Sequence, residues 1–139
     1  MHLHLPHVNY LAVLVSAVAI FILGGLWYSK ALFANKWIAL MGKSEEELKT
    51  AAKPGAMPLV IAFICSLLIS WTMAIIVNHF GHEPGMGLAV AFHCWLGFAA
   101  PTSFATATFS GQPKALWLIN SGYNLVSFLI AGAILGMWH

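Results

Sequence analysis

Four long apolar segments constrain this chain most, because a soluble fold of its size could not bury them. They cover about residues 8–26, 57–78, 86–104 and 114–138, and none contains Asp or Glu. A helix needs about 20 mainly apolar residues to cross the hydrocarbon of a bilayer. Each segment is therefore predicted to be a transmembrane helix. The 139 residues leave room for one four-helix domain and for no separate soluble domain.

The composition supports a membrane protein. Only 7% of the residues are charged and 60% are hydrophobic, whereas about 25% of the residues in a soluble domain are charged. A chain this short is mostly surface, so a large core cannot explain the difference. The lipid bilayer is thus the predicted solvent. A formal net charge of +2 is too small for the basic stripe that nucleic-acid binding needs, so no nucleic-acid partner is expected.

The end of the first span is marked by a change from apolar to aromatic to basic residues. Gly24 and Gly25 are followed by Trp27 and Tyr28, and then by Lys30. Aromatic rings favour headgroup depth and a cation favours water, so the helix leaves the bilayer here. Because the chain start lacks a Lys/Arg-rich region, we expect a retained span and not a signal peptide.

The connection over residues 30–56 is the one long polar segment. Its apolar residues share one side of a short helix, which predicts an amphipathic helix lying in the membrane interface: Leu32, Phe33, Trp37, Leu40 and Met41. Ser44 and Glu47 then form a capping box for a further short helix. The second connection is a tight Gly- and Pro-containing turn, and residues 102–112 are expected to fray into a loop.

The lysines predict which way the chain faces. Five lie in the connection over residues 30–56, and the sixth is Lys114 in the third connection. With four spans these two connections share a side, and positive charge near span ends marks the cytoplasmic side. We expect a multi-pass protein of the cytoplasmic membrane with both termini external and the Lys-rich connection cytoplasmic.

Several sequence blocks resemble a known family. They include Gly-Gly-Leu-Trp-Tyr-Ser at residues 24–29 and Leu-Trp-Leu-Ile-Asn-Ser-Gly-Tyr at residues 116–123. The other blocks are residues 7–12, 32–33, 95–98 and 132–138. On these blocks the chain is similar to the family catalogued as domain of unknown function 1761. The resemblance implies a small four-span membrane protein, and it implies no reaction, ligand or site.

Histidines at the external ends are the first candidates for chemistry. Under the predicted topology six of them share that side of the membrane: His2, His4, His7, His79, His82 and His139. Imidazole is a common metal ligand, so Zn or Cu could bind there. The alternative is that these histidines are polar interfacial residues. No cofactor is otherwise predicted.

Polar residues within the spans are the second set of candidates. His93 lies about 10 Å into the third span at 1.5 Å per residue, and an ionisable group at such depth is by default a functional hypothesis. Asn120, Tyr123 and Asn124 fall with Ser127 on one face of the fourth span. They could line a polar path, or they could hydrogen-bond neighbouring helices. His93 could equally be a neutral ring bonded to a neighbouring helix.

Two packing features lead to further predictions. Small residues let helices approach closely, so the chain is expected to self-associate through the Gly132/Gly136 face or the Ser66/Ser70 face. Pro101 frees the carbonyl four residues earlier, that of Gly97. Asn124 of the fourth span is at a similar depth, so we predict that its amide donates to this oxygen.

The sequence favours a non-enzymatic function. Its four Glu lie outside the spans, so neither a catalytic triad nor paired carboxylates can assemble. Cys65 and Cys94 lie in apolar segments, where buried thiols are inert packing residues more often than redox or metal groups. The main hypothesis is a helix-bundle protein that self-associates or joins a larger membrane assembly. A small pore or carrier lined by His93 and the Asn120/Asn124 stripe, and an external metal-binding protein, are the alternatives.

Overall fold

The computed structural model describes residues 7–29, 31–41, 56–81 and 83–138. Three single helices are long and apolar enough to cross a membrane, namely α1 (Tyr10–Trp27), α4 (Ala56–Phe80) and α7 (Lys114–Met137). The fourth span is a continuous helical run of α5 (Pro84–Cys94), the π-helical turn η1 (Trp95–Ala99) and α6 (Ala100–Phe109). The short helix α2 (Ala34–Met41) lies between the first two spans. The predicted all-α, four-span fold is confirmed, while the predicted capping box falls outside the described residues.

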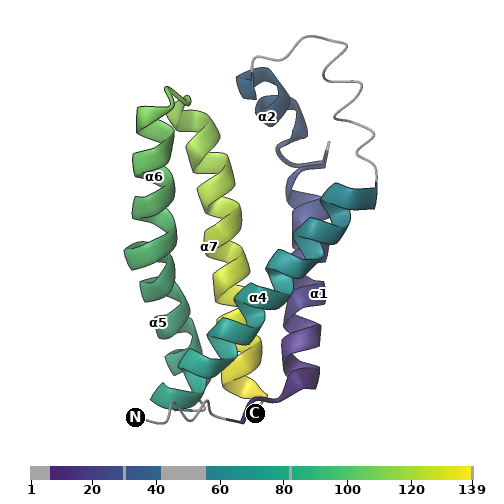
Figure 1. The fold of residues 1–139 in the computed structure, drawn as a ribbon, viewed down its shortest axis with the longest axis vertical. Helices are drawn as coiled ribbons and strands as arrows, with labels where there is room; N and C mark the ends of the chain where they lie inside the picture. Colours follow the sequence, from purple (N-terminus) through teal and green to yellow (C-terminus); the bar gives the residue numbers. More distant parts are fainter. Residues whose placement is uncertain (1–6, 30, 42–55, 82, 139) are drawn as a thin grey trace.

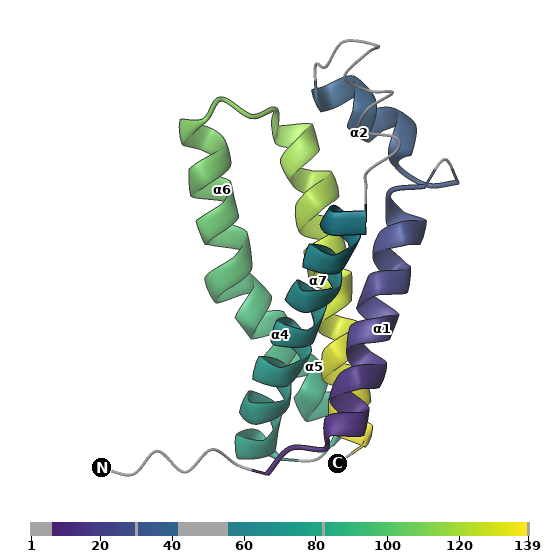
Figure 2. The ribbon, with the colours of Figure 1, turned by 45° about the vertical axis from the view of Figure 1, so that its right-hand side comes forward.

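The helices run back and forth between two ends of the bundle. The start of α1, the end of α7 and the turn between α4 and α5 lie at one end (Figures 1 and 2). Helix α2 and the turn between α6 and α7 lie at the other end. Lys36 on α2 and Lys114 at the start of α7 therefore share an end, as four crossings require.

Local signals in the sequence define where these helices begin. The side-chain oxygen of Asn9 accepts from the amides of Leu11 at 3.1 Å and Ala12 at 3.2 Å, which caps α1. Pro113 immediately precedes α7, and its fixed φ suits a helix start. The Asn78 amide near the end of α4 donates to the His7 carbonyl at 3.0 Å. This bond ties the beginning of the described chain to the α4–α5 end.

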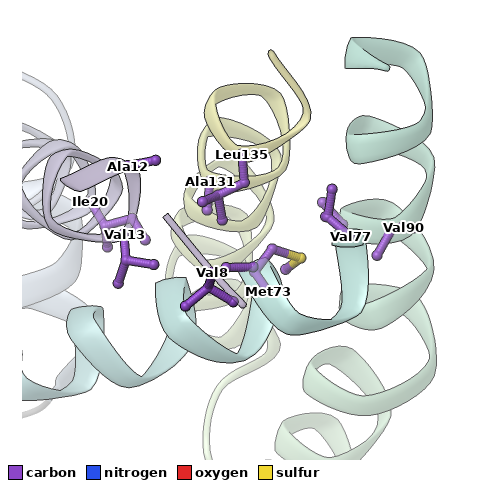
Figure 3. Close-up of a cluster of buried hydrophobic side chains, with 11 residues drawn as sticks. Val8, Ala12, Val13, Ile20, Met73, Val77, Val90, Ala131 and Leu135 are labelled. Carbon is purple, nitrogen blue, oxygen red and sulfur yellow. The ribbon is translucent and has the colours of Figure 1, made fainter. Parts of the chain in front are cut away.

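The core lies near the end of the bundle that holds the start of α1. It is built of small and branched side chains from α1, α4, α5 and α7 (Figure 3). In that view Val77 of α4 lies beside Val90 of α5. Ala131 and Leu135 of α7 pack in the same cluster. Small side chains suit this position, because dispersion contacts between close helices replace the hydrophobic effect inside lipid.

The tightest helix pair is α5 against α7, and it depends on glycines. A methyl group built on Gly87 would lie 2.0 Å from the Gly132 carbonyl oxygen and 3.2 Å from the Gly136 Cα. A methyl group on Gly132 would lie 2.3 Å from the Gly87 oxygen. The two backbones are thus in direct contact, as in other small-residue helix crossings.

This packing corrects the predicted association faces. Gly132 and Gly136 are buried against α5 of the same chain, and Ser66 and Ser70 are buried inside the bundle as well. Neither face is available to a second copy. The prediction that these faces mediate association is therefore wrong, because a pattern of small residues cannot tell a face used within the chain from one used between chains.

The third span is longer than expected. The sequence predicts a span over residues 86–104 and a loop over residues 102–112, but the helix continues to Phe109. The expected loop is wrong because most of its hydroxyls donate to carbonyls one turn back within the helix, as with Thr106 to Thr102 at 3.0 Å and Thr108 to Phe104 at 2.8 Å. Such bonds satisfy a hydroxyl without ending the helix.

Candidate functional site

Aromatic residues at the end of α1 interlock with the first half of α7. The Trp27 indole donates to the Ile119 carbonyl at 2.9 Å, and the Tyr28 hydroxyl donates to the Asn120 side-chain oxygen at 2.7 Å. Both bonds join residues 92 positions apart in the sequence. Residues Trp27, Tyr28, Asn120 and Tyr123 are called the aromatic clamp below.

Glycines make room for the clamp. A methyl group on Gly24 would lie 3.0 Å from the Tyr123 hydroxyl oxygen, and one on Gly122 would lie 3.2 Å from the Trp27 ring. Gly25, the next residue, has nothing within 4 Å of such a methyl group. A methyl group on either of the two glycines facing the clamp would therefore be tight enough to push the neighbouring ring by a few tenths of an ångström, whereas one on Gly25 would meet open space.

The clamp also positions α2. The Trp27 ring centroid lies 4.9 Å from that of Phe33, and the Tyr28 centroid lies 5.3 Å from that of Trp37 on α2 and 5.5 Å from that of Tyr123. Edge-to-face and tilted pairs at these distances are favourable beyond their buried area. One aromatic chain thus connects α2, the end of α1 and α7.

A cavity of about 420 Å³ lies beside the clamp, between α1, α4 and α7. Its wall includes both tyrosines of the clamp, Gly24 and Ser66. Burial, with a smaller contribution from neighbouring Tyr123, raises the pKa of Tyr28 to about 12. Its phenol stays protonated at ordinary pH and keeps donating to Asn120. Among the described residues, the cavity wall holds hydroxyls but no carboxylate or imidazole.

The polar stripe of α7 is divided among different neighbours. Asn120 accepts from Tyr28, and the Tyr123 hydroxyl donates to the Ile20 carbonyl on α1 at 3.3 Å. Ser127 is buried, with no hydrogen-bond partner in the described part of the chain. Asn120 and Tyr123 thus join α7 to α1 and its C-cap residue, Tyr28.

The predicted bond between Asn124 and Gly97 is wrong. The hydrogen bonds of the described residues include none between these two groups, and the third span relieves its proline differently. The chain widens into the π-turn η1, where the Ala100 amide donates to the Trp95 carbonyl. The Thr102 hydroxyl donates to the Phe98 carbonyl, and the Ser103 hydroxyl to the Ala99 carbonyl at 2.6 Å. Local hydroxyls thus bond the Phe98 and Ala99 carbonyls from within the same helix.

His93 lies on the outer side of α5 and not in the bundle interior. Its Nδ1 atom donates to the Ala89 carbonyl of the same helix at 2.7 Å. The ring is exposed in the single chain and borders a lateral crevice between α4 and α5. It is therefore not brought together with Asn120, which is bonded at the contact of α1 with α7.

Two of the six external histidines lie among the described residues. The His7 carbonyl accepts from Asn78, and the neighbouring His79 ring bonds the Ile75 carbonyl at 2.8 Å. His2, His4, His82 and His139 are outside the described residues. Within the described ranges no group of three or more His, Cys, Asp or Glu side chains could hold a metal ion. Zinc or copper binding by the full set stays a prediction.

The sequence analysis missed the role of the tryptophan indoles. Besides Trp27, the Trp95 indole donates to the Ser121 carbonyl at 3.1 Å, and the Trp117 indole to the Ser103 hydroxyl at 3.0 Å. Each bond joins α7 to another span. The available signal was chemical: an indole N–H within a span needs an acceptor, since hydrocarbon supplies none.

Fold and contacts together define a small four-span membrane protein whose helices are joined by aromatic hydrogen bonds. A family described as protein of unknown function (DUF1761) matches residues 11–136. The chain belongs to this family. No curated protein matches the chain, and no solved structure does. Two of the blocks on which the chain resembles this family, residues 24–29 and 116–123, are the segments that meet in the aromatic clamp.

Proposed function

We propose that this protein is a non-enzymatic helix bundle that self-associates in the membrane through its third span. The observation that carries the proposal is a mismatch between burial and hydropathy. Over an 18-residue stretch, the third span has a mean hydropathy of 1.3, whereas the other three spans have values of 1.6 to 2.6. Only 17% of that stretch is buried in the single chain, whereas 28% to 33% of the corresponding stretches of the other spans are buried. The span least suited to lipid is thus the one most exposed in the single chain.

Helix α6 supplies the surface. Its main contacts with the other described helices are with α7 and the adjoining η1. Its exposed residues include the larger Phe104 and Phe109, and also small or hydroxyl-bearing residues, among them Thr102, Ala105, Thr106 and Thr108. Such residues let a second helix approach closely, which is how spans associate when the hydrophobic effect is absent.

A second copy of the chain is the partner that we propose. Two-fold association is the commonest symmetry of homo-oligomers, and it places the same face on both sides of the contact. The Ala and Thr side chains of α6 can pack on an identical face without leaving large gaps. A different membrane protein on this face is the competing outcome of the experiment below.

Cysteine crosslinking in native membranes tests the proposal. In a background with Cys65 and Cys94 replaced by Ala, Ala105→Cys is oxidised and the product is separated without reductant. Leu118→Cys is the matched control, because Leu118 is 62% exposed and lies a similar number of residues from the α6–α7 turn. We expect a disulfide-linked dimer from Ala105→Cys only. Absence of dimer, equal dimer from both variants, or a crosslink of Ala105→Cys to another protein would contradict self-association through α6.

The geometry lends no such support to a pore or carrier in the single chain, since His93 and Asn120 lie on different helix contacts. Localisation in the cytoplasmic membrane with external termini is part of the proposal, and it is supported by Lys36 and Lys114 sharing one end of the bundle.

A further inference from the structure

Among the described residues that line the crevice between α4 and α5, one carries a strongly polar group and the others form a mainly apolar wall. It has a volume of about 440 Å³, and its lining combines aliphatic and aromatic side chains with His93 and Cys94. The aromatic members are Phe80 and Phe98. A thiol is only a weak hydrogen-bonding group, so the imidazole decides the polarity of this crevice.

The hydrogen bond of His93 determines which chemistry the ring offers. A carbonyl oxygen can only accept, so Nδ1 donates its proton to Ala89 at 2.7 Å. In an uncharged imidazole with Nδ1 protonated, the other nitrogen, Nε2, is an acceptor. The described residues place no hydrogen bond on Nε2. The crevice therefore presents a single acceptor, and it fits an apolar molecule with one hydrogen-bond donor at its head.

The depth of His93 in the span limits which kinds of hydrogen-bond donor can reach its ring. His93 is eight residues after Gly85, where the span begins, so it lies about 12 Å along the helix. The hydroxyl groups of ordinary lipids stay near the headgroups, because exposure of a polar group to hydrocarbon is costly. A donor at this depth belongs to a molecule that dissolves as a whole in hydrocarbon. A phenol or hydroquinone meets this condition, and its flat ring suits the Phe80 and Phe98 wall.

A second cavity adjoins the crevice. It has a volume of about 350 Å³ and shares Ile76, Cys94 and Phe98 with the first. From there its wall continues along α4 to Leu68 and includes Phe128 of α7. An alkyl tail attached to the ring could follow this apolar channel while the ring remains beside His93.

We propose that the α4–α5 crevice binds a lipid-soluble phenol or hydroquinone, whose hydroxyl donates to Nε2 of His93 and whose tail lies along α4. This site is separate from the α6 surface, so the inference does not depend on self-association. The proposal concerns binding alone and includes no electron transfer.

Binding of decylhydroquinone tests the proposal. The full chain is reconstituted in lipid nanodiscs, and quenching of tryptophan fluorescence is titrated with decylhydroquinone or with its dimethyl ether, which lacks both donors. Nanodiscs without protein correct for partitioning into lipid. One hydrogen bond is worth up to about 1.5 kcal/mol, so we expect the hydroquinone to bind the wild-type chain about tenfold more tightly than the ether.

Three variants test whether His93 is responsible for the preference for the hydroquinone over the ether. His93→Phe should remove the preference for the hydroquinone, and His93→Gln, which keeps an acceptor oxygen, should retain part of it. His79→Phe is the matched control, because the His79 ring also bonds a carbonyl one turn back, that of Ile75, but does not line the crevice. It should bind as the wild type does. Equal binding of hydroquinone and ether by the wild-type chain, or an unchanged preference in His93→Phe, would overturn the proposal.

Discussion

Among single residues, the two asparagines of α7 show how different the roles of similar side chains can be. Asn120 and Asn124 are one helical turn apart, and both are partly buried. Asn120 accepts a 2.7 Å hydrogen bond from Tyr28, whereas the described residues give the Asn124 side chain no such bond. Sequence reasoning grouped the two because helical periodicity reports which face a residue occupies. It does not report whether a partner hydroxyl comes within reach.

The Tyr28–Asn120 bond should contribute measurably to stability. We expect Tyr28→Phe to lower the free energy of unfolding by about 1 kcal/mol, because the partly buried Asn120 oxygen loses its donor. Tyr10→Phe is the control, since Tyr10 is 67% exposed and its hydroxyl makes no bond to other described residues. Thermal unfolding in detergent measures both.

Because Asn120 accepts the bond from Tyr28, Asn120→Leu should destabilise the chain more than Asn124→Leu. The reverse order would contradict the assigned contacts.

Among helices, the crossing of α5 with α7 depends on the absence of side chains. We expect Gly87→Ala to lower the free energy of unfolding by about 1–3 kcal/mol, because the added methyl group forces two backbones apart. Gly97→Ala is the control, since a methyl group there has nothing within 4 Å and Ala favours a helix more than Gly does. Melting temperatures in the same detergent compare the two. Equal behaviour of both variants would show that the crossing tolerates separation.

Helix positions were largely predictable, and helix partners were not. Apolar length located all four spans, because the bilayer sets a minimum that each segment must meet. It missed residues 105–109 of α6, where Thr side chains look like loop residues but bond to their own helix. The Gly132/Gly136 pattern correctly indicated a close approach of helices. Only the structure shows that the partner is Gly87 of the same chain and not a second copy.

The whole molecule has a predicted orientation that can be measured directly. We expect both termini outside the cytoplasm, because the described lysines near span ends, Lys36 and Lys114, lie at the opposite end of the bundle from the start of α1 and the end of α7. An alkaline phosphatase fused after His139 should be active, and a green fluorescent protein fused at the same position should remain dark. A bright fluorescent fusion with an inactive phosphatase would reverse the orientation.

The bend of the third span at η1 gives the bundle unequal ends. At the end with the α4–α5 turn, α5 lies against α7, while α6 leans away from α4 toward the opposite end (Figures 1 and 2). Each leaflet of the bilayer therefore meets a different cross-section of the same protein. The protein presents a wide perimeter to the leaflet around the α6–α7 turn and a narrow perimeter to the leaflet around the start of α1.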